Sequence, residues 1–353
     1  MLAGMRPIPL RPDAGALVER NVNALARVAI AKALARLDPR CDARNHLRTR
    51  WPEDSTGPLI LRAASEPATL ASNPALGRTL IADLIATIGP TGAGARLLQA
   101  GLQLVFGSAS AIYVPGLEAT ADKVAFVREG APVPVHGLAV TGALLEPRKL
   151  AVIVALSAEM IESSNAESLV TDALTRATSL AIDAALFDAL PADDVRPVGL
   201  RYGIAASTAS ASTDPDAAMI EDLSALAATV SVIGGPIMFV TAPGRAAAVS
   251  LRTQRELPFP VLGSPAVAAD DVIAIATQGI ASATDAVPEI SSSRMATVHM
   301  DTVPLPIADN ADTLAAPTRS LWQTNAVGIK FRFNASWALR DPRGLAWLTA
   351  TGW

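Results

Sequence analysis

The sequence contains little of what marks secreted, membrane-bound or redox-active proteins. Its 353 residues include a single cysteine, Cys41, which excludes an internal disulfide framework and a cysteine-rich metal site. No apolar run approaches the roughly 20 residues that span a bilayer. The longest one, LAVIVAL from Leu150, fits a buried strand. The first residues, MLAGMRPIPLRPD, lack the apolar core of a signal peptide. We therefore expect a protein that is made in a reducing cytoplasm and is not exported by that route.

Patterns typical of catalysis are equally scarce. The three histidines show no metal-ligand or catalytic spacing: His46, His136 and His299. The segment GPTGAGA resembles a phosphate-binding loop, but no Lys-Ser or Lys-Thr pair follows it. Glu159 and Glu162 have the spacing of a carboxylate pair, but the start of a solvated helix accounts for both. The sequence therefore predicts no catalytic residue, no metal and no cofactor, although catalytic residues can also assemble from distant positions.

Charge is distributed unevenly along the chain. The net charge is −4, but residues 1–50 contain ten Arg and Lys against four Asp and Glu, a net of +6 that leaves −10 for the other 303 residues. Asp13 and Pro39 bracket a predicted amphipathic helix in this basic segment. This helix either docks on its own subunit or contacts neighbouring subunits or a polyanion. No recognisable nucleic-acid-binding module accompanies it.

A long β-hairpin is predicted over residues 108–145, where two strand-like runs are joined by the polar turn EATADK. Its second strand contains two prolines at a spacing of two, Pro132 and Pro134, which remove two N–H donors from one edge. That edge cannot form a regular ladder, and a two-stranded ribbon is only marginally stable alone. We therefore expect a partner outside the hairpin to complete it.

The segments that flank the hairpin predict a strap, two helices and a strand. Residues 51–77 are rich in Pro, Ser and Thr, which predicts an extended strap. Residues 80–88 and 93–104 are predicted to be helical. The apolar run 150–156 after the hairpin predicts a strand that is covered on both faces.

A long helix is predicted to begin at a capping-box pair, Ser164 and Glu167, and to end before Pro191. At about 25 residues it is expected to be roughly 37 Å long. One apolar stripe returns to its starting azimuth after five turns and predicts the buried face: Leu169, Ala173, Ala177, Leu180, Ala184 and Phe187.

The last third of the chain changes in style. Residues 198–311 alternate short helical and strand patterns with Gly, Pro and Ser turns, which predicts a compact α/β insert whose first helix opens at Asp214 and Pro215. The segment NAVGIKFRFNASWAL alternates apolar and polar residues and predicts a long strand with one apolar and one solvated face. Four of the five tryptophans lie in the last 32 residues, so the carboxyl end is expected to help fill the main core.

The order of these blocks resembles the major capsid proteins of tailed bacteriophages with the Hong Kong 97-type fold, of α+β class. The resemblance covers residues 75–353 and rests on five degenerate patterns in fixed order: AFVREGAPVPV, EPRKLAVIVALSAEMIESS, SLAIDAALF, FPVLGSPAVAADDVIAI and SLWQTNAVGIKFRFNASWALRDPRGLAWLT. It implies these parts: a basic helical N-terminal extension (1–50), an N-terminal arm (51–107), an extended hairpin called the E-loop (108–145), a peripheral domain with a long spine helix (146–197 and 312–353), and an α/β axial domain (198–311).

The resemblance implies a structural protein and not an enzyme. Such a major head protein self-assembles into hexamers and pentamers of an icosahedral shell around double-stranded phage DNA. Its implied partners are further copies of itself, a portal, possible cement proteins and packaged DNA held non-specifically, with no membrane. Its implied location is the virion, assembled in the host bacterial cytoplasm. Because the E-loop of this family reaches over an adjacent subunit, the expected assembly residues are Lys123, Phe126, Arg128, Glu129, Pro132 and Pro134.

Some relatives crosslink a hairpin lysine to an asparagine of a neighbouring subunit. Nothing near Lys123, the only lysine of this hairpin, marks it as activated, so we do not predict the crosslink. Two alternatives to a phage capsid remain. An encapsulin-like nanocompartment shell has the same fold but encloses protein cargo, and the length and basic segment favour the virus. A soluble, alanine-rich α/β enzyme would form a small oligomer with a polar cleft.

Overall fold

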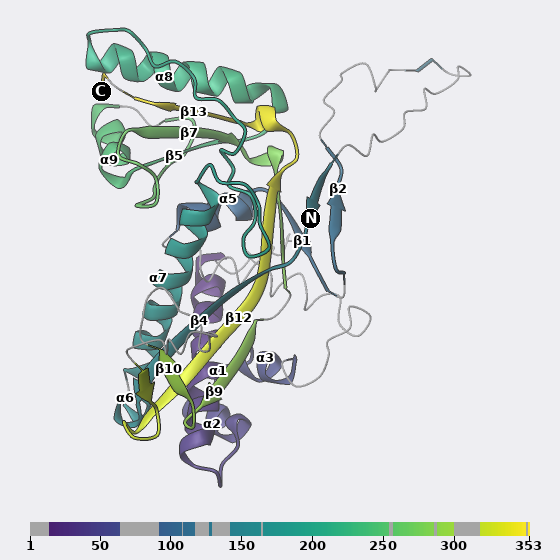
Figure 1. Cartoon of the computed structure of the whole chain (residues 1–353), viewed down its shortest axis with the longest axis vertical. Helices are drawn as coiled ribbons and strands as arrows, with labels where there is room; N and C mark the ends of the chain where they lie inside the picture. Colours follow the sequence, from purple (N-terminus) through teal and green to yellow (C-terminus); the bar gives the residue numbers. More distant parts are fainter. Residues whose placement is uncertain are drawn as a thin grey trace, which may run out of the picture. The chain divides into compact units, whose positions relative to one another are not determined.

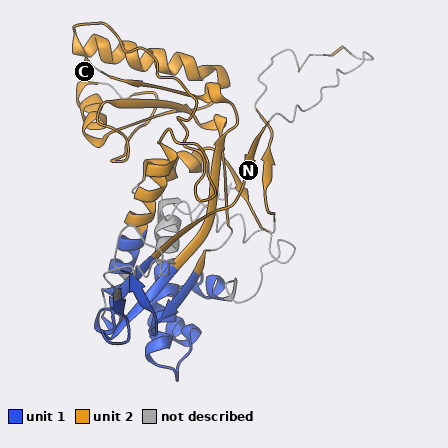
Figure 2. Ribbon diagram, viewed as in Figure 1, with its two compact units in different colours: residues 1–67, 153–174, 290–330 blue, residues 68–152, 175–289, 331–353 orange. Residues whose placement is uncertain are grey.

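The structure is a computed structural model, and it describes residues 14–63, 92–107, 109–116, 127–128, 142–163, 165–253, 257–285, 288–299, 318–350 and 352–353. Helices and strands are both present, which confirms the predicted α+β class (Figure 1). The chain forms two compact units (Figure 2). Unit 1 comprises residues 1–67, 153–174 and 290–330, and unit 2 comprises residues 68–152, 175–289 and 331–353. Three elements continue from one unit into the other: β4 (Arg148–Ser157), α7 (Ala166–Leu186) and β12 (Ala326–Leu339).

Unit 1 is built around a buried, alanine-rich helix. This helix, α1 (Ala14–Leu37), contacts three others: α2 (Ala43–Arg50), α3 (Gly57–Ala63) and α6 (Ala158–Glu162). Over residues 24–33 every side chain is buried except those of Arg27 and Lys32, which are half-buried. Small side chains on all sides of α1 let the other helices approach closely. Of the alternatives for the basic segment, docking on its own subunit is confirmed for this part of the helix.

Short strands complete unit 1. In it, β9 (Glu289–Ser293) pairs with β12, and β10 (Thr297–His299) pairs antiparallel with β11 (Thr318–Ser320). Two hydrogen bonds fix β9 against α1. Lys32 Nζ donates to the Ile290 carbonyl at 2.6 Å, and Ser292 Oγ donates to the Lys32 carbonyl at 3.1 Å. The half-buried lysine of α1 is therefore used within the unit.

The predicted strap over residues 51–77 is wrong in its first half, because α3 lies within it. Asp54 Oδ1 accepts hydrogen bonds from the backbone N–H groups of Thr56 and Gly57, both at 2.9 Å, at the point where the helix begins. Pro58 lies in the first turn, where a helix tolerates proline. Ile60 is 3% exposed, so burial of its side chain stabilises a helix that the Pro, Ser and Thr content of the segment did not predict. The rest of the predicted strap lies outside the described residues, as does the predicted helix 80–88.

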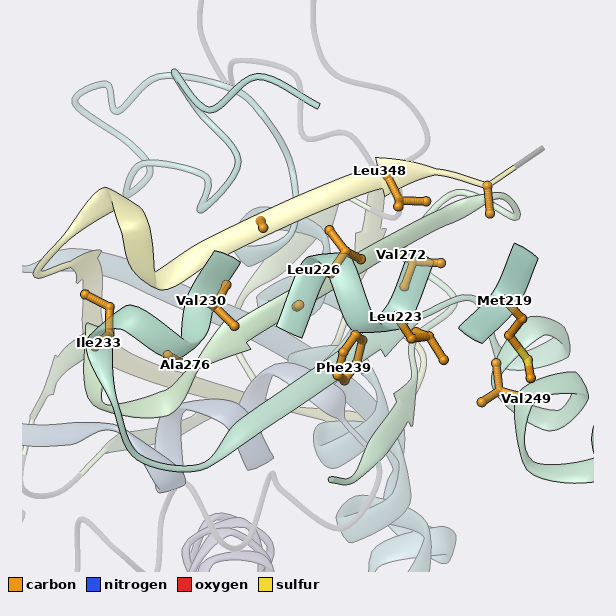
Figure 3. Packing of buried hydrophobic residues seen from close by; sticks show 13 residues of the cluster. Met219, Leu223, Leu226, Val230, Ile233, Phe239, Val249, Val272, Ala276 and Leu348 are labelled. Atoms are coloured by element: carbon orange, nitrogen blue, oxygen red, sulfur yellow. The ribbon is translucent and has the colours of Figure 1, made fainter. Parts of the chain in front are cut away.

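Unit 2 contains a four-stranded sheet in the order β13-β7-β5-β6. Its strands are β5 (Ile237–Thr241), β6 (Val261–Gly263), β7 (Asp271–Ala276) and β13 (Leu345–Thr349). The helix α8 (Pro215–Val230) contacts β7 and β13, and α9 (Pro243–Arg252) contacts β5 and β6. Asp214 caps α8 through its side chain, as predicted. Figure 3 shows the apolar core of this α/β layer, whose buried members include Met219, Leu223, Leu226, Val230, Phe239, Val249, Val272 and Leu348. Helices and strands therefore alternate in this region as predicted, although β13 of the sheet lies outside the predicted insert 198–311.

A second sheet in unit 2 contains the long strand of the carboxyl end. In it, β1 (Leu102–Val105) pairs parallel with β8 (Ile280–Thr284), β8 pairs antiparallel with β12, and β4 follows β12 in the strand order. The predicted helix 93–104 is therefore too long, since α5 (Ala93–Ala100) ends at Gly101 and β1 follows. A Cβ at Gly101 would lie 3.0 Å from the Ile280 carbonyl oxygen, so glycine permits the turn against β8.

The carboxyl end joins the sheet of the α/β insert. Antiparallel pairing of β13 with β7 places Trp347 opposite Ile273, and Trp347 Nε1 donates to the Ile204 carbonyl at 2.9 Å. The structure thus divides this region differently from the predicted boundary between 198–311 and 312–353. Trp337 is 4% exposed, as expected for a core residue, whereas Trp322 is 70% exposed. Three short 3-10 helices complete the described elements: Ser231–Ile233, Thr277–Gly279 and Pro342–Gly344.

Candidate assembly surfaces

The base of the predicted hairpin is formed by β2 (Ile112–Val114) and β3 (Ala143–Leu145), which pair antiparallel. This pairing confirms that the two arms of the hairpin meet. On one face, Val114 and Leu145 are at most 1% exposed and pack on Phe106 and strands β8 and β12. On the other face, the cross-strand pair Tyr113 and Leu144 is 71% and 42% exposed. The ribbon therefore presents an aromatic and an aliphatic side chain to solvent at its base.

Most of the predicted assembly residues lie outside the described residues: Lys123, Phe126, Glu129, Pro132 and Pro134. Arg128 is described and exposed, and the adjacent Val127 is 39% exposed. The structure does not bring Arg128 into contact with any described carboxylate. The unpaired proline edge of the hairpin therefore stays a prediction.

The sequence predicted the wrong buried face for the long helix α7, which buries the opposite side. Leu169 is 46% exposed and Leu180 is 54% exposed, and the alanines of the predicted stripe are exposed as well. Only Phe187, directly after the helix, is buried as expected. The buried side comprises Ala166, Val170, Leu174, Thr178, Ser179, Ile182, Asp183 and Leu186. At about 100° per residue these two sets lie on roughly opposite sides of the helix. The exposed side of α7 is therefore an apolar stripe, shared with the exposed Arg176, that the described residues leave uncovered.

Polar groups on the covered face of α7 explain the wrong prediction. Asp183 is 1% exposed, and its Oδ1 accepts a hydrogen bond from Gly94 N at 2.8 Å, in the first turn of α5. Its Oδ2 accepts one from Ser264 Oγ at 2.6 Å. A Cβ at Gly92 would overlap Ser179 Oγ, so glycine lets α5 approach α7 without moving that hydroxyl. Gly92 and Gly94 thus lie where α5 approaches α7, and Gly94 presents its amide to a carboxylate of the same chain.

The strand β4 is partly covered on one face only. Half-buried and exposed positions alternate along most of its length, and Ile153 is 53% exposed. The prediction of a strand covered on both faces is therefore wrong within the described residues. The run LAVIVAL is apolar as predicted, but no part of the chain that the structure describes covers its outward side chains. Together with α7, this strand leaves apolar surface that a partner can bury.

A fourth exposed apolar feature lies beside the β10–β11 pair of unit 1. Register places Thr297 opposite Ser320, and the Leu321 N–H continues the ladder to the Ala296 carbonyl at 3.1 Å. Met295 lies in the bend before Ala296, and Trp322 lies in the turn after Leu321. These two side chains are 82% and 70% exposed. Tryptophan and methionine are both enriched at the centres of protein interfaces, so this pair is a candidate contact.

Burial in two cases and hydrogen bonds in a third account for perturbed carboxylate pKa values. Burial raises the pKa of Asp183 and of Asp285, whose Oδ2 accepts from Asn334 N at 2.8 Å. The pKa of Glu159 is lowered by its own backbone N–H and by Asn325 Nδ2, which donates at 2.9 Å. Glu159 is therefore engaged at the start of α6, in agreement with its reading as a helix-start residue.

Neither a metal site nor a membrane span emerges from the described segments. No three His, Cys, Asp or Glu side chains gather there as a metal site. Every helix in the same segments is too short or too polar to cross a bilayer.

The sequence did not predict the true orientation of α7 or the exposed side chains of Tyr113, Leu144, Met295 and Trp322. The signal for α7 was present, because an alanine-rich helix with leucines on two sides has two apolar stripes, and only one was considered. For Met295 and Trp322 no local sequence pattern indicates whether the side chain is exposed or buried. Their exposure depends on what the rest of the fold covers.

Comparison with known proteins gives one curated relative. No family model matches the chain. The chain is similar to the capsid polyprotein of Pseudomonas phage PAJU2, with 26% identity over 258 residues. This match covers 65% of the chain, and the chain spans only 37% of the length of that curated relative.

Solved structures with a similar course of the chain come from virus-like particles. A chain of the satellite phage P4 procapsid that includes the size determination (Sid) protein has a TM-score of 0.49 at 10% identity, over 75% of this chain and 97% of that one. A chain of Microbacterium phage Oxtober96 has a TM-score of 0.49 at 15% identity, over 74% and 91%. The capsid of an empty GTA particle has a TM-score of 0.42 at 14% identity, over 74% and 92%.

Proposed function

We propose that this chain is a major capsid protein of a tailed bacteriophage with the Hong Kong 97-type fold. Copies of it assemble into hexamers and pentamers that tile an icosahedral shell around double-stranded DNA. The uncovered apolar face of α7 carries the proposal, because a helix of 21 residues that exposes Leu169 and Leu180 needs a partner along its length. The similarity to a phage capsid polyprotein supports the same role.

The role of the hairpin follows from its base. Tyr113 and Leu144 form an exposed cross-strand pair that no described residue covers, and such a surface is available to a partner. In the proposed shell the E-loop, residues 108–145, extends over an adjacent subunit. There Lys123, Phe126, Arg128, Glu129, Pro132 and Pro134 contribute to the contact. The two prolines keep one edge from adding strands without limit.

The remaining assignments complete this proposal. Residues 51–107 are the N-terminal arm, residues 146–197 with 312–353 the peripheral domain, and residues 198–311 the axial domain, to which β13 contributes a strand. The protein acts as a structural component without catalysis and resides in the virion after assembly in the bacterial cytoplasm. A portal and possible cement proteins are its further partners.

Electron microscopy and sizing of the purified full-length protein test the proposal. We expect closed shells of megadalton mass, and a small oligomer or monomer would refute the proposal in favour of a soluble protein. The content of isolated particles separates a virus from an encapsulin-like shell. Nuclease-protected double-stranded DNA supports the capsid, whereas an enclosed enzyme supports the nanocompartment.

A matched pair of variants tests the role of α7. Leu180→Glu places a charge on its uncovered face, and Leu251→Glu places the same charge on α9, where Leu251 is 83% exposed. Both substitutions are at exposed positions and should change the free energy of unfolding by no more than about 0.5 kcal/mol. We expect Leu180→Glu to prevent shell formation and Leu251→Glu to permit it. Normal shells from Leu180→Glu would show that this face has no partner.

A further inference from the structure

Four arginines surround the turn between α1 and α2 and are all exposed: Arg36, Arg40, Arg44 and Arg48. They recur at intervals of four residues. Arg36 lies one residue before the end of α1, Arg40 lies in the turn, and Arg44 and Arg48 share one side of α2. Only residues 38–42 separate the two helices, so the four side chains belong to one end of the helical hairpin. We call these four residues the basic tip.

No described carboxylate forms an ion pair with an arginine of the basic tip. The two acidic residues of the turn are engaged by backbone amides: Asp38 Oδ1 accepts from Arg40 N at 3.0 Å, and Asp42 Oδ1 accepts from Asn45 N at 2.7 Å. Within the described part of the chain, none of the four guanidinium groups forms an ion pair or a side-chain hydrogen bond. Residues 36–48 therefore carry four arginines against two aspartates, a net charge of +2, and the four guanidinium groups are not held in ion pairs with described residues.

Other arginines of the same helices are used differently. Arg27 pairs with Asp54 at 3.5 Å, and both side chains are largely buried. Arg50 Nη1 donates to the Ile161 carbonyl at 3.3 Å, and its guanidinium lies 5.3 Å from the Trp51 ring centre. These two arginines hold unit 1 together. The basic tip has no such task in the fold, so its charge is available for an external anion.

We propose that the basic tip binds the phosphate backbone of duplex nucleic acid without sequence preference. Arg44 and Arg48 are separated by about 6 Å along the helix axis, which is close to the roughly 7 Å rise of two phosphates along one strand of B-form DNA. Guanidinium groups bind phosphate oxygens in a bidentate manner. This inference rests on the proposed function, since a shell that encloses DNA brings this ligand to the protein.

The composition of the tip favours nucleic acid over an acidic protein surface. The exposed residues of α2 are Arg44, Asn45, Arg48 and Thr49, and none of them is apolar. Protein interfaces derive most of their affinity from desolvated aromatic and aliphatic anchors, which this surface lacks. Phosphate contacts need only cations and hydrogen-bond donors, because the release of counterions supplies the free energy.

Salt-dependent DNA binding by the full-length protein tests the proposal. Fluorescence anisotropy of a labelled 20-base-pair duplex is measured between 50 and 200 mM KCl for the natural chain, for Arg44→Gln/Arg48→Gln, and for the control Arg96→Gln/Arg252→Gln. The control removes the same charge from exposed positions on α5 and α9. Each lost phosphate contact lowers the slope of log K against log salt by about 0.9. We expect the tip variant to lose about 1.8 from the slope and the control to lose little.

The outcomes separate this inference from the proposed function. Equal slopes for the natural chain and the tip variant overturn the inference, even where shells form normally. A tip variant that binds DNA normally but fails to assemble, with an unchanged melting temperature, also overturns it and assigns the tip to an acidic surface of a second copy. Loss of salt-dependent binding in a protein that never forms shells refutes the proposed function and leaves the basic tip as a nucleic-acid site.

Discussion

Replacement of Asp183 tests how the covered face of α7 is held. Its carboxylate accepts hydrogen bonds from Gly94 N at 2.8 Å and from Ser264 Oγ at 2.6 Å, and the residue is 1% exposed. Asp183→Ala removes both acceptors from a buried site. A buried donor without a partner costs about 1–3 kcal/mol. The Ser264 hydroxyl can rotate toward another acceptor, whereas the Gly94 amide cannot, so we expect a loss of about 2–4 kcal/mol in the free energy of unfolding.

Asp183→Asn separates hydrogen bonding from charge. The asparagine Oδ1 can accept from Gly94 N, and its amide can donate to Ser264 Oγ, so the geometry is retained. Burial raises the pKa of Asp183, which means that the folded state holds its proton to a higher pH than the unfolded state does. Between the ordinary carboxyl pKa of about 3.9 and the raised value, the unfolded state binds fewer protons. The free energy of unfolding therefore falls as the pH rises through that window.

The assay is urea unfolding of the unassembled chain, followed by tryptophan fluorescence at several pH values between 4 and 7. We expect Asp183→Asn to remain within about 1 kcal/mol of the natural chain and to lose the decline in stability with rising pH. Asp183→Ala should be clearly less stable at every pH. Equal stability of Asp183→Ala and the natural chain would contradict the reasoning, as would an Asp183→Asn variant that is as unstable as Asp183→Ala.

Two further predictions concern backbone conformation and a half-buried ion pair in unit 2. Gly203 has φ +74° and Gly244 lies in α9, and a Cβ at either position meets nothing within 4 Å. Gly203→Ala should therefore lower the free energy of unfolding by about 1 kcal/mol, and Gly244→Ala should raise it by about 0.5–1 kcal/mol. Melting temperatures that shifted in the same direction for both variants would contradict this. Arg201 Nη1 donates to Asp271 Oδ2 at 2.5 Å, with the two side chains 15% and 11% exposed. Arg201→Met should cost about 3 kcal/mol by leaving the carboxylate unpaired. Adding Asp271→Asn should restore part of that loss in urea unfolding, and no restoration would assign the cost to packing instead.

The elements that could be predicted from the sequence carry strong local signals. Asp214 followed by Pro215 marks the start of α8, because the aspartate caps the first amides and proline suits the first turn. Strict alternation over residues 327–337 predicts β12, and its apolar positions are at most 7% exposed. The predicted solvated face is wrong, because Gly328 and Ser336 are buried and Lys330 is the one exposed residue of the strand. In both cases the deciding information lies within a few residues of the element itself.

The end of α5 could not be predicted in the same way. Its helical pattern continues past Ala100 in the sequence, but residues 102–105 pair with β8, a strand about 180 residues further along the chain. Pairing with a strand so distant overrides the local helical preference. No residue near Gly101 predicts this pairing. Five of the six predicted assembly residues also remain untested, since the structure describes only Arg128 among them.

The orientation of α7 was wrong for a related reason. Hydrophobic stripes predict which face a helix buries when the chain covers its own apolar surface. Here the covered face contains Thr178, Ser179 and Asp183, whose polarity is matched by the amino end of α5 and by Ser264. The rule therefore selected the more apolar face, which the described residues leave exposed.

The uncovered face of α7 also restricts what can cover it. Leu169 and Leu180 are eleven residues apart, which corresponds to about 16 Å along the axis. The residues on this face between them include Ala173 and Ala177, whose small side chains allow another backbone to approach closely. A side chain inserted at one point would contact only one of the two leucines. An elongated partner is therefore required, either a helix or about five residues of extended chain, since a strand rises about 3.3 Å per residue. A short contact confined to one leucine would leave the other exposed, so substitution of Leu169 and of Leu180 should weaken assembly to a similar extent.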